Sequence, residues 1–166
     1  MATFHSLFIQ EVKRRLFEES IPRCKKCLDL LTEEEIWFRP NESSNSVGNL
    51  ILHLCGNARQ WIVAGFGKAP DVRERGSEFE ERGPLPTAVL IHLLDSLQTD
   101  LNEVLDALTA EDLLQTWPVQ VFEENGIAIL THVVEHFSYH TGQITYFVKA
   151  RKDLDTAYYG DLKLEQ

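Results

Sequence analysis

The sequence predicts an all-α protein that folds as one four-helix bundle domain over residues 1–166. Four long segments, at about residues 4–31, 45–66, 86–108 and 127–152, carry apolar side chains near the helical period. No internal repeat and no linker divides the chain. Because amphipathic helices bury their apolar faces against one another, we expect a bundle with short extra helices and long loops.

Local signals set the expected boundaries between these elements. Pro22 lies inside the first segment and is expected to kink or split it, since proline lacks an N–H. Thr32 and Thr109 each precede acidic residues, so each is expected to cap a short helix. The alternation of apolar and polar residues from Trp117 to Phe122 predicts an extended segment, and the charged, glycine-containing residues 67–83 predict a long loop.

The composition excludes several classes of function. Hydrophobic residues make up 43% and charged residues 25% of the chain, the balance of a globular protein. A net charge of −10 argues against a nucleic-acid partner, because phosphate binding needs clustered Lys and Arg. The apolar stretches are too short to cross a bilayer, and the N-terminus lacks the pattern of a signal peptide. We therefore expect a soluble cytoplasmic protein that does not bind membranes.

Cys24 and Cys27 form a C-x-x-C pattern, which occurs in zinc and redox sites. No second C-x-x-C completes a structural zinc site, and the preceding sequence is helical rather than a strand. We interpret the two cysteines as small apolar side chains, one helical turn apart, that pack in the core.

The histidines carry the strongest chemical signal. His132, His136 and His140 follow one another at four-residue spacing, so they lie near one face of the last helix. Two imidazoles at i and i+4 can reach one metal ion, and His53, within an apolar run of the second helix, could supply a third ligand. The alternative is a set of core histidines hydrogen-bonded to the backbone. Spacing alone leaves both alternatives open and does not choose between the three members of the row.

Two stretches carry a resemblance to a known family. The segment from Trp37 to Asn57 and the motif Val-Glu-His136-Phe-Ser-Tyr-His140-Thr-Gly-Gln-Ile resemble the DinB-like (DinB/YfiT) superfamily, and within it a subfamily of uncharacterised bacterial proteins. The similarity covers nearly the whole chain, including the segment 71–79. It implies an up-up-down-down helical bundle, often dimeric, with a metal held by His53, His136 and His140.

The resemblance also implies a class of activity. Relatives include thiol-dependent S-transferases and isomerases that use bacillithiol, mycothiol or glutathione. The chain is accordingly expected to be a metal-dependent enzyme of the thiol S-transferase type, with zinc or nickel, a small-molecule substrate and a homodimeric assembly. The alternatives are a metal-dependent hydrolase and a non-catalytic, stress-related metal-binding dimer. No catalytic acid or base is assigned.

Further residues are candidates for the pocket around the metal. They are His132, Asn57 and Tyr139. Family members commonly carry an arginine before the Gly-Gln pair, where this chain has Thr141. If that arginine binds substrate anions, another cation must do so here, and Arg73 and Arg75 are the candidates.

Overall fold

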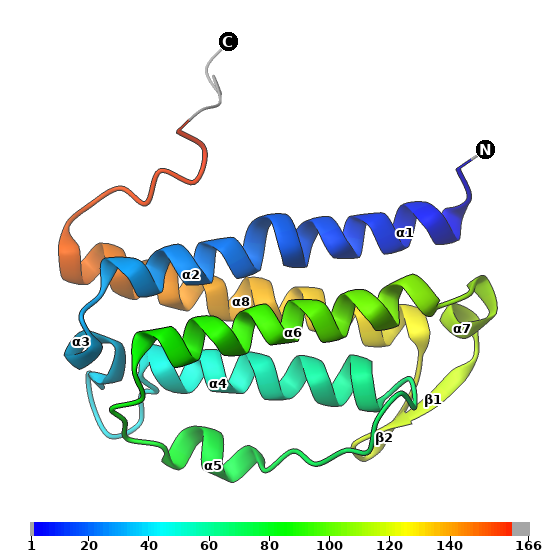
Figure 1. Cartoon of the computed structure of the whole chain (residues 1–166), viewed down its shortest axis with the longest axis horizontal. Helices are drawn as coiled ribbons and strands as arrows, with labels where there is room; N and C mark the ends of the chain where they lie inside the picture. The colour runs from blue at the N-terminus through cyan, green and yellow to red at the C-terminus, as the bar shows by residue number, and fades with distance from the viewer. Residues whose placement is uncertain (1, 161–166) are drawn as a thin grey trace.

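The computed structural model describes residues 2–160, and four long helical rods form its body (Figure 1). The elements in chain order are α1 (Phe4–Lys13), η1 (Arg14–Ser20), α2 (Ile21–Leu30), α3 (Glu33–Trp37), α4 (Val47–Ala58), η2 (Arg59–Ala64), α5 (Arg75–Glu80), α6 (Thr87–Ala107), α7 (Ala110–Leu114), β1 (Thr116–Val119), β2 (Phe122–Asn125) and α8 (Gly126–Lys152). The four rods are α1-η1-α2, α4-η2, α6 and α8. The predicted all-α four-helix class is confirmed.

Contacts between the rods give their directions. Lys13 pairs with Asp106 and Lys25 with Asp95, so the first rod and α6 are antiparallel. In contrast, Cys24 contacts Thr141, and Cys27, farther along the first rod, contacts Thr145, farther along α8. The first rod and α8 are therefore parallel. The second rod and α8 are antiparallel, because His53 contacts His140 whereas Trp61, farther along the second rod, contacts His132, earlier in α8. The rods therefore run up-down-down-up. The predicted order, up-up-down-down, was wrong for the second and fourth rods.

The lengths of the connections explain this order. The second rod and α6 are parallel, so the chain must return along the bundle between them. Residues 65–86 make that return, a length of extended chain that exceeds the rise of the second rod. The other two connections only reverse direction, one through α3 and the other through α7 and the β1–β2 hairpin (Figure 1).

Pro22 does not break the first rod. The residues just before it form a π-helical stretch, in which the N–H of Ile21 donates to the carbonyl of Leu16. α-Helical hydrogen bonding resumes in the first turn of α2, which contains Pro22. The predicted split is thus a change of hydrogen-bond register within a continuous rod.

The predicted caps are confirmed. The hydroxyl of Thr32 accepts from the N–H of Glu35, and that of Thr109 accepts from the N–H of Asp112. The carboxylate of each acid in turn accepts from the backbone N–H of its threonine. The segment predicted to be extended forms β1 and β2, an antiparallel hairpin.

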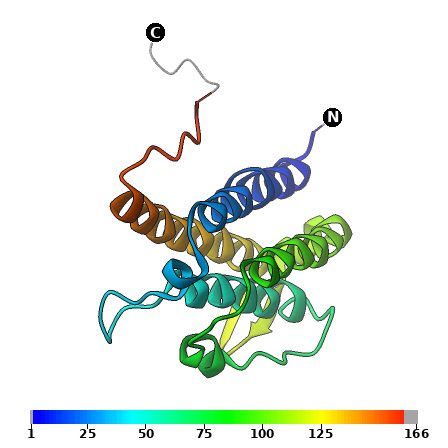
Figure 2. The same cartoon turned by 60° about the vertical axis from the view of Figure 1, so that its left-hand side comes forward.

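The segment 67–83, predicted as a loop, contains the short helix α5. No side chain caps this helix, so no local signal marked it. It is held instead by tertiary bonds, because the side-chain amide of Asn49 in α4 donates to the carbonyls of Glu78 and Glu81, both at 2.9 Å. Helix α5 and the hairpin lie on the same side of the bundle as α4 (Figures 1 and 2).

The apolar core lies between the four rods. Leu16, Ile51, Leu94 and Phe137, one from each rod, are fully buried. Cys24 and Cys27 are buried free thiols, as the sequence predicted, and burial raises the pKa of the Cys24 thiol to about 12, so it stays protonated. Within the described residues, no helix is both long and apolar enough to span a membrane.

Candidate metal centre

Three histidines meet where α4 faces α8. His53 lies in the middle of α4, among apolar neighbours that pack on the core, and only 6% of it is exposed. His136 and His140 lie one turn apart on α8, which is antiparallel to α4. Their ring centroids lie 4.8 and 5.1 Å from that of His53, and 4.5 Å from each other.

The ligand nitrogens of these rings converge on one point. Nε2 of His53 lies 3.0 Å from Nε2 of His136, and one nitrogen from each of the three rings lies within 4.8 Å of the others. In a tetrahedral zinc site with Zn–N bonds of about 2.0–2.1 Å, ligand nitrogens lie about 3.4 Å apart. Shifts of about 1 Å would therefore place all three rings on one ion.

The outer nitrogens of two rings determine which tautomer is present. Nδ1 of His53 lies 2.9 Å from Oε2 of Glu78, and Nδ1 of His140 lies 2.7 Å from Oε1 of Gln143. Nη2 of Arg73 also lies 3.0 Å from Nδ1 of His53, and this nitrogen donates to Oε2 of Glu78 at 2.8 Å. Because a carboxylate oxygen and an amide oxygen only accept, these two partners favour the hydrogen on Nδ1 of each ring and a lone pair on each Nε2. A cation is the natural partner for lone pairs that converge in this way, so the residues fit a divalent metal.

Burial keeps the two imidazoles on α8 neutral. Burial lowers the pKa of His136 to about 3, with a further contribution from neighbouring His140, His53, His132 and Arg73. Burial also lowers the pKa of His140. Neutral imidazole is the form that binds metals, so the centre is prepared for an ion at neutral pH.

These shifts predict how the stability of the metal-free protein depends on pH. In the unfolded chain these histidines bind protons near pH 6.5, whereas in the fold His136 stays neutral to about pH 3. The unfolded state therefore binds more protons below pH 6.5. The free energy of unfolding, fully present above that pH, should fall by about 1 kcal/mol per pH unit below it.

Urea unfolding in the presence of a chelator, between pH 7.5 and 5.5, measures this slope. The His136→Gln variant should show a flatter profile, because it lacks the titrating group. Equal slopes in the two proteins would show that His136 is not the group responsible for the pH dependence.

A buried charged pair lies behind His53. Arg73 donates through Nε to Oε1 of Glu78 at 2.7 Å and through Nη2 to Oε2 at 2.8 Å. Burial raises the pKa of the Glu78 carboxyl, but the hydrogen bonds from Arg73 and His53 and the charge of Arg73 outweigh this effect and lower the pKa overall. The side chain of Arg73 is only 4% exposed. Arg73 is thus engaged by Glu78 and is not free to bind substrate anions. The structure therefore does not support the role for which Arg73 was a candidate.

The other candidate cation is placed differently. Arg75 is exposed and its guanidinium lies 4.9 Å from the ring centroid of Phe79. That ring in turn lies 4.8 Å from the ring of His53. Arg75 therefore lies at the surface, one aromatic ring away from the centre.

The remaining pocket candidates lie along the same α4–α8 seam. His132 stacks on Trp61 with centroids 3.8 Å apart, outside the three-histidine group, and its buried Nε2 has no hydrogen-bond partner. Asn57 is buried and its Oδ1 also lacks a partner. Tyr139 is 63% exposed, with its ring 5.0 Å from that of His140.

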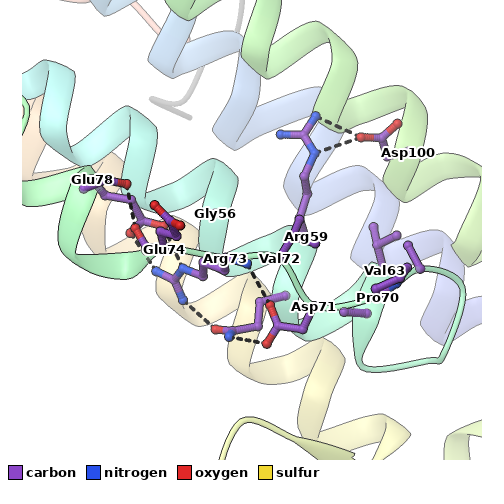
Figure 3. Close-up of a pocket in the computed structure, with 14 residues that line it drawn as sticks. Gly56, Arg59, Val63, Pro70, Asp71, Val72, Arg73, Glu74, Glu78 and Asp100 are labelled. Carbon is purple, nitrogen blue, oxygen red and sulfur yellow. Dashed lines mark hydrogen bonds and ion pairs between the residues drawn. The ribbon is translucent and has the colours of Figure 1, made fainter.

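Two cavities adjoin this region. One, of about 500 Å³, lies beside His140 between α8 and the residues that precede α4. It is lined by uncharged side chains, among them Ser43, Asn45, Tyr139, Gln143 and Tyr146. The other, of about 480 Å³, lies behind Arg73 and Glu78, between α4-η2 and residues 69–78 (Figure 3). Both have volumes suited to small molecules.

Comparison with known proteins places the chain in a family. A family described as a protein of unknown function, DUF1572, matches residues 3–159. The chain belongs to this family. No curated protein matches it.

Solved structures show the fold that this DUF1572 chain shares. A DinB-like protein from Bacillus subtilis has a TM-score of 0.67 at 18% identity, covering 90% of this chain and 97% of the other. A DinB-like protein from Bacillus cereus scores 0.65 at 20% identity, with 90% and 93% covered. A conserved protein from Enterococcus faecalis scores 0.68 at 16% identity, with 90% and 97% covered. The DUF1572 chain therefore has the predicted DinB-like fold.

Sequence reasoning did not assign Glu78 to the site. The residue lies 25 positions after His53 in a segment predicted as a loop, and acidic residues are frequent on either side of it. One signal pointed there: the segment 71–79 forms part of the DinB-like resemblance. That resemblance marked the segment without indicating which of its residues contacts a histidine.

Proposed function

We propose that this chain is a metal-dependent enzyme in which His53, His136 and His140 hold a divalent ion, zinc or nickel. The supporting observation is the convergence of the three imidazoles, two of which have Nδ1 hydrogens engaged by oxygen acceptors. Three protein ligands leave a coordination position free, as in catalytic rather than structural sites. An ion in this place would lower the pKa of a bound thiol or water and so supply a nucleophile near neutral pH.

The proposed reaction is the transfer of a low-molecular-weight thiol to an electrophilic small molecule. The thiolate sulfur forms a new carbon–sulfur bond, and the leaving group departs with the electron pair of the bond that breaks. The DinB-like fold supports this choice, since S-transferases occur among proteins with the motif resemblance described above. The cavity of about 500 Å³ beside His140 offers room for the electrophile, and its uncharged lining suits a neutral molecule.

Metal analysis and thiol consumption test the proposal in sequence. Purified protein loaded with zinc or nickel and dialysed should retain one ion per chain. It should then consume thiol when an epoxide or a chlorinated aromatic is present, and His136→Ala protein should not. Turnover of esters or amides without thiol would indicate that the protein is a hydrolase and not a transferase. Retained metal without either activity would favour a non-catalytic metal-binding protein.

Arg75 is proposed to bind a carboxylate of the thiol, since it is the exposed cation next to the Phe79–His53 contact. The Arg75→Ala variant should raise the KM for an anionic thiol by about 3- to 10-fold with little change in kcat, because exposed charge contacts contribute modestly. Lys68→Ala, an exposed cation of the same long connection, is the control and should leave KM unchanged. Equal KM values for the two variants would remove Arg75 from the binding site.

The homodimer and the cytoplasmic location stay predictions. Light scattering of the metal-loaded protein tests the first. A monomer at micromolar concentration would contradict it.

A further inference from the structure

The Arg73–Glu78 pair is more costly than a simple anchor for α5 requires. Both side chains are nearly buried, at 4% and 9% exposure, and charges taken out of water lose hydration that their mutual attraction only partly returns. Neutral bonds already attach this segment, because the Asn49 amide holds the carbonyls of Glu78 and Glu81. The charged pair therefore calls for a role other than docking α5.

The geometry of Glu78 directs it at His53. Its Oε2 accepts from Nδ1 of His53 at 2.9 Å, on the side of the ring opposite to the nitrogen that faces His136. The α4 backbone leaves room for this approach. A Cβ at position 56 would lie 2.0 Å from Oε1 of Glu78, so only glycine at that position permits it.

Arg73 is itself held on several sides. Its Nη1 donates to Oε1 of Gln60 at 2.8 Å, and its backbone N–H donates to Oδ1 of Asp71 at 3.1 Å (Figure 3). Two parallel bonds to Glu78 then orient the carboxylate. The result is a chain of contacts from Gln60 through Arg73 and Glu78 to His53. Nη2 of Arg73 also lies 3.0 Å from Nδ1 of His53, so Arg73 flanks the bond between Glu78 and the imidazole.

We propose that Glu78 and Arg73 are positioning residues for the metal centre: Glu78 holds His53 as the Nδ1–H tautomer and strengthens Nε2 as a donor, and Arg73 orients Glu78. This inference rests on the proposed metal centre and adds residues outside the three ligands. Mutation of the carboxylate partner of a metal-binding histidine typically weakens metal binding by about 10- to 100-fold. Neither residue is expected to touch the substrate.

The test compares Glu78→Gln with Glu80→Gln, a matched control at an exposed position of the same helix. The zinc Kd, measured in competition with a chromophoric chelator, should rise about 10- to 100-fold in Glu78→Gln and stay at the wild-type value in Glu80→Gln. Saturating cobalt gives a second readout. The visible absorption bands of Co(II) should shift in Glu78→Gln, because the donor strength of His53 changes.

The outcomes separate positioning from structure. A purely structural Glu78 would lower the melting temperature of the metal-free protein while leaving the zinc Kd and the cobalt spectrum unchanged, and this result would overturn the inference. If Glu78→Gln does not fold, Arg73→Lys, which keeps the charge but loses the paired bonds, should raise the zinc Kd by a smaller factor. An unchanged Kd in Arg73→Lys would also overturn the inference. Wild-type protein that binds zinc but consumes no thiol refutes the transferase alone, whereas wild-type protein that binds no zinc refutes the metal centre and this inference together.

Discussion

Replacing His53 with alanine is expected to reduce retained zinc from about one ion per chain to below about a tenth, because two imidazoles of one helix do not complete a stable site. His53 is the only member of the group that comes from α4, so its loss leaves the ion bound from one side. Inductively coupled plasma measurements after dialysis give the metal content.

The control for this variant is His92→Ala. His92 is exposed on α6, and its removal should leave the zinc content unchanged. Circular dichroism should show the same helical content for both variants. Full zinc content in folded His53→Ala protein would rule out the three-histidine centre, and with it the proposed enzyme.

The largest effect on stability is expected from Phe137→Ala. Phe137 is fully buried in α8, next in sequence to His136, and it is among the largest fully buried side chains. Truncating a buried phenylalanine removes apolar contacts and leaves a cavity, which should lower the free energy of unfolding by about 3–5 kcal/mol. Urea unfolding followed by circular dichroism measures this change.

Tyr146→Ala is the matched variant on the same helix. Tyr146 is 77% exposed, so its loss should change the free energy of unfolding by no more than about 0.5 kcal/mol. Where Phe137→Ala remains folded at low temperature, its zinc Kd should stay near the wild-type value, since Phe137 is not a ligand. Similar losses of stability in the two variants would show that α8 does not pack as described.

Local features of this protein could be predicted because neighbouring residues determine them. The cap at Thr32 depends on a hydroxyl and on Glu35 three positions later, and the row of histidines on α8 depends on the helical repeat. The resemblance then selected His136 and His140 and joined them to His53. The structure places those three together and stacks His132 on Trp61 instead.

Features that depend on distant segments could not be predicted in this way. The directions of the rods depend on residues 65–86, which return along the bundle between the second rod and α6. No local pattern in that segment indicates the path that it takes. Helix α5 lacks a capping side chain and is held instead by hydrogen bonds from Asn49 and His53 of α4 to Glu78. Arg73 was a candidate for substrate anions because the chain has Thr141 where family members commonly carry an arginine, whereas the structure buries Arg73 against Glu78.

The sequence by itself determined the helical bundle, the helix caps, the buried thiols and a histidine row able to bind a metal. All of these arise from the helical period and from bonds within one turn of the chain. Only the tertiary structure decided that the carboxylate behind His53 is Glu78 and that Arg73 holds it. These two residues reach His53 from another part of the chain, and only close packing against Gly56 brings the carboxylate to the imidazole.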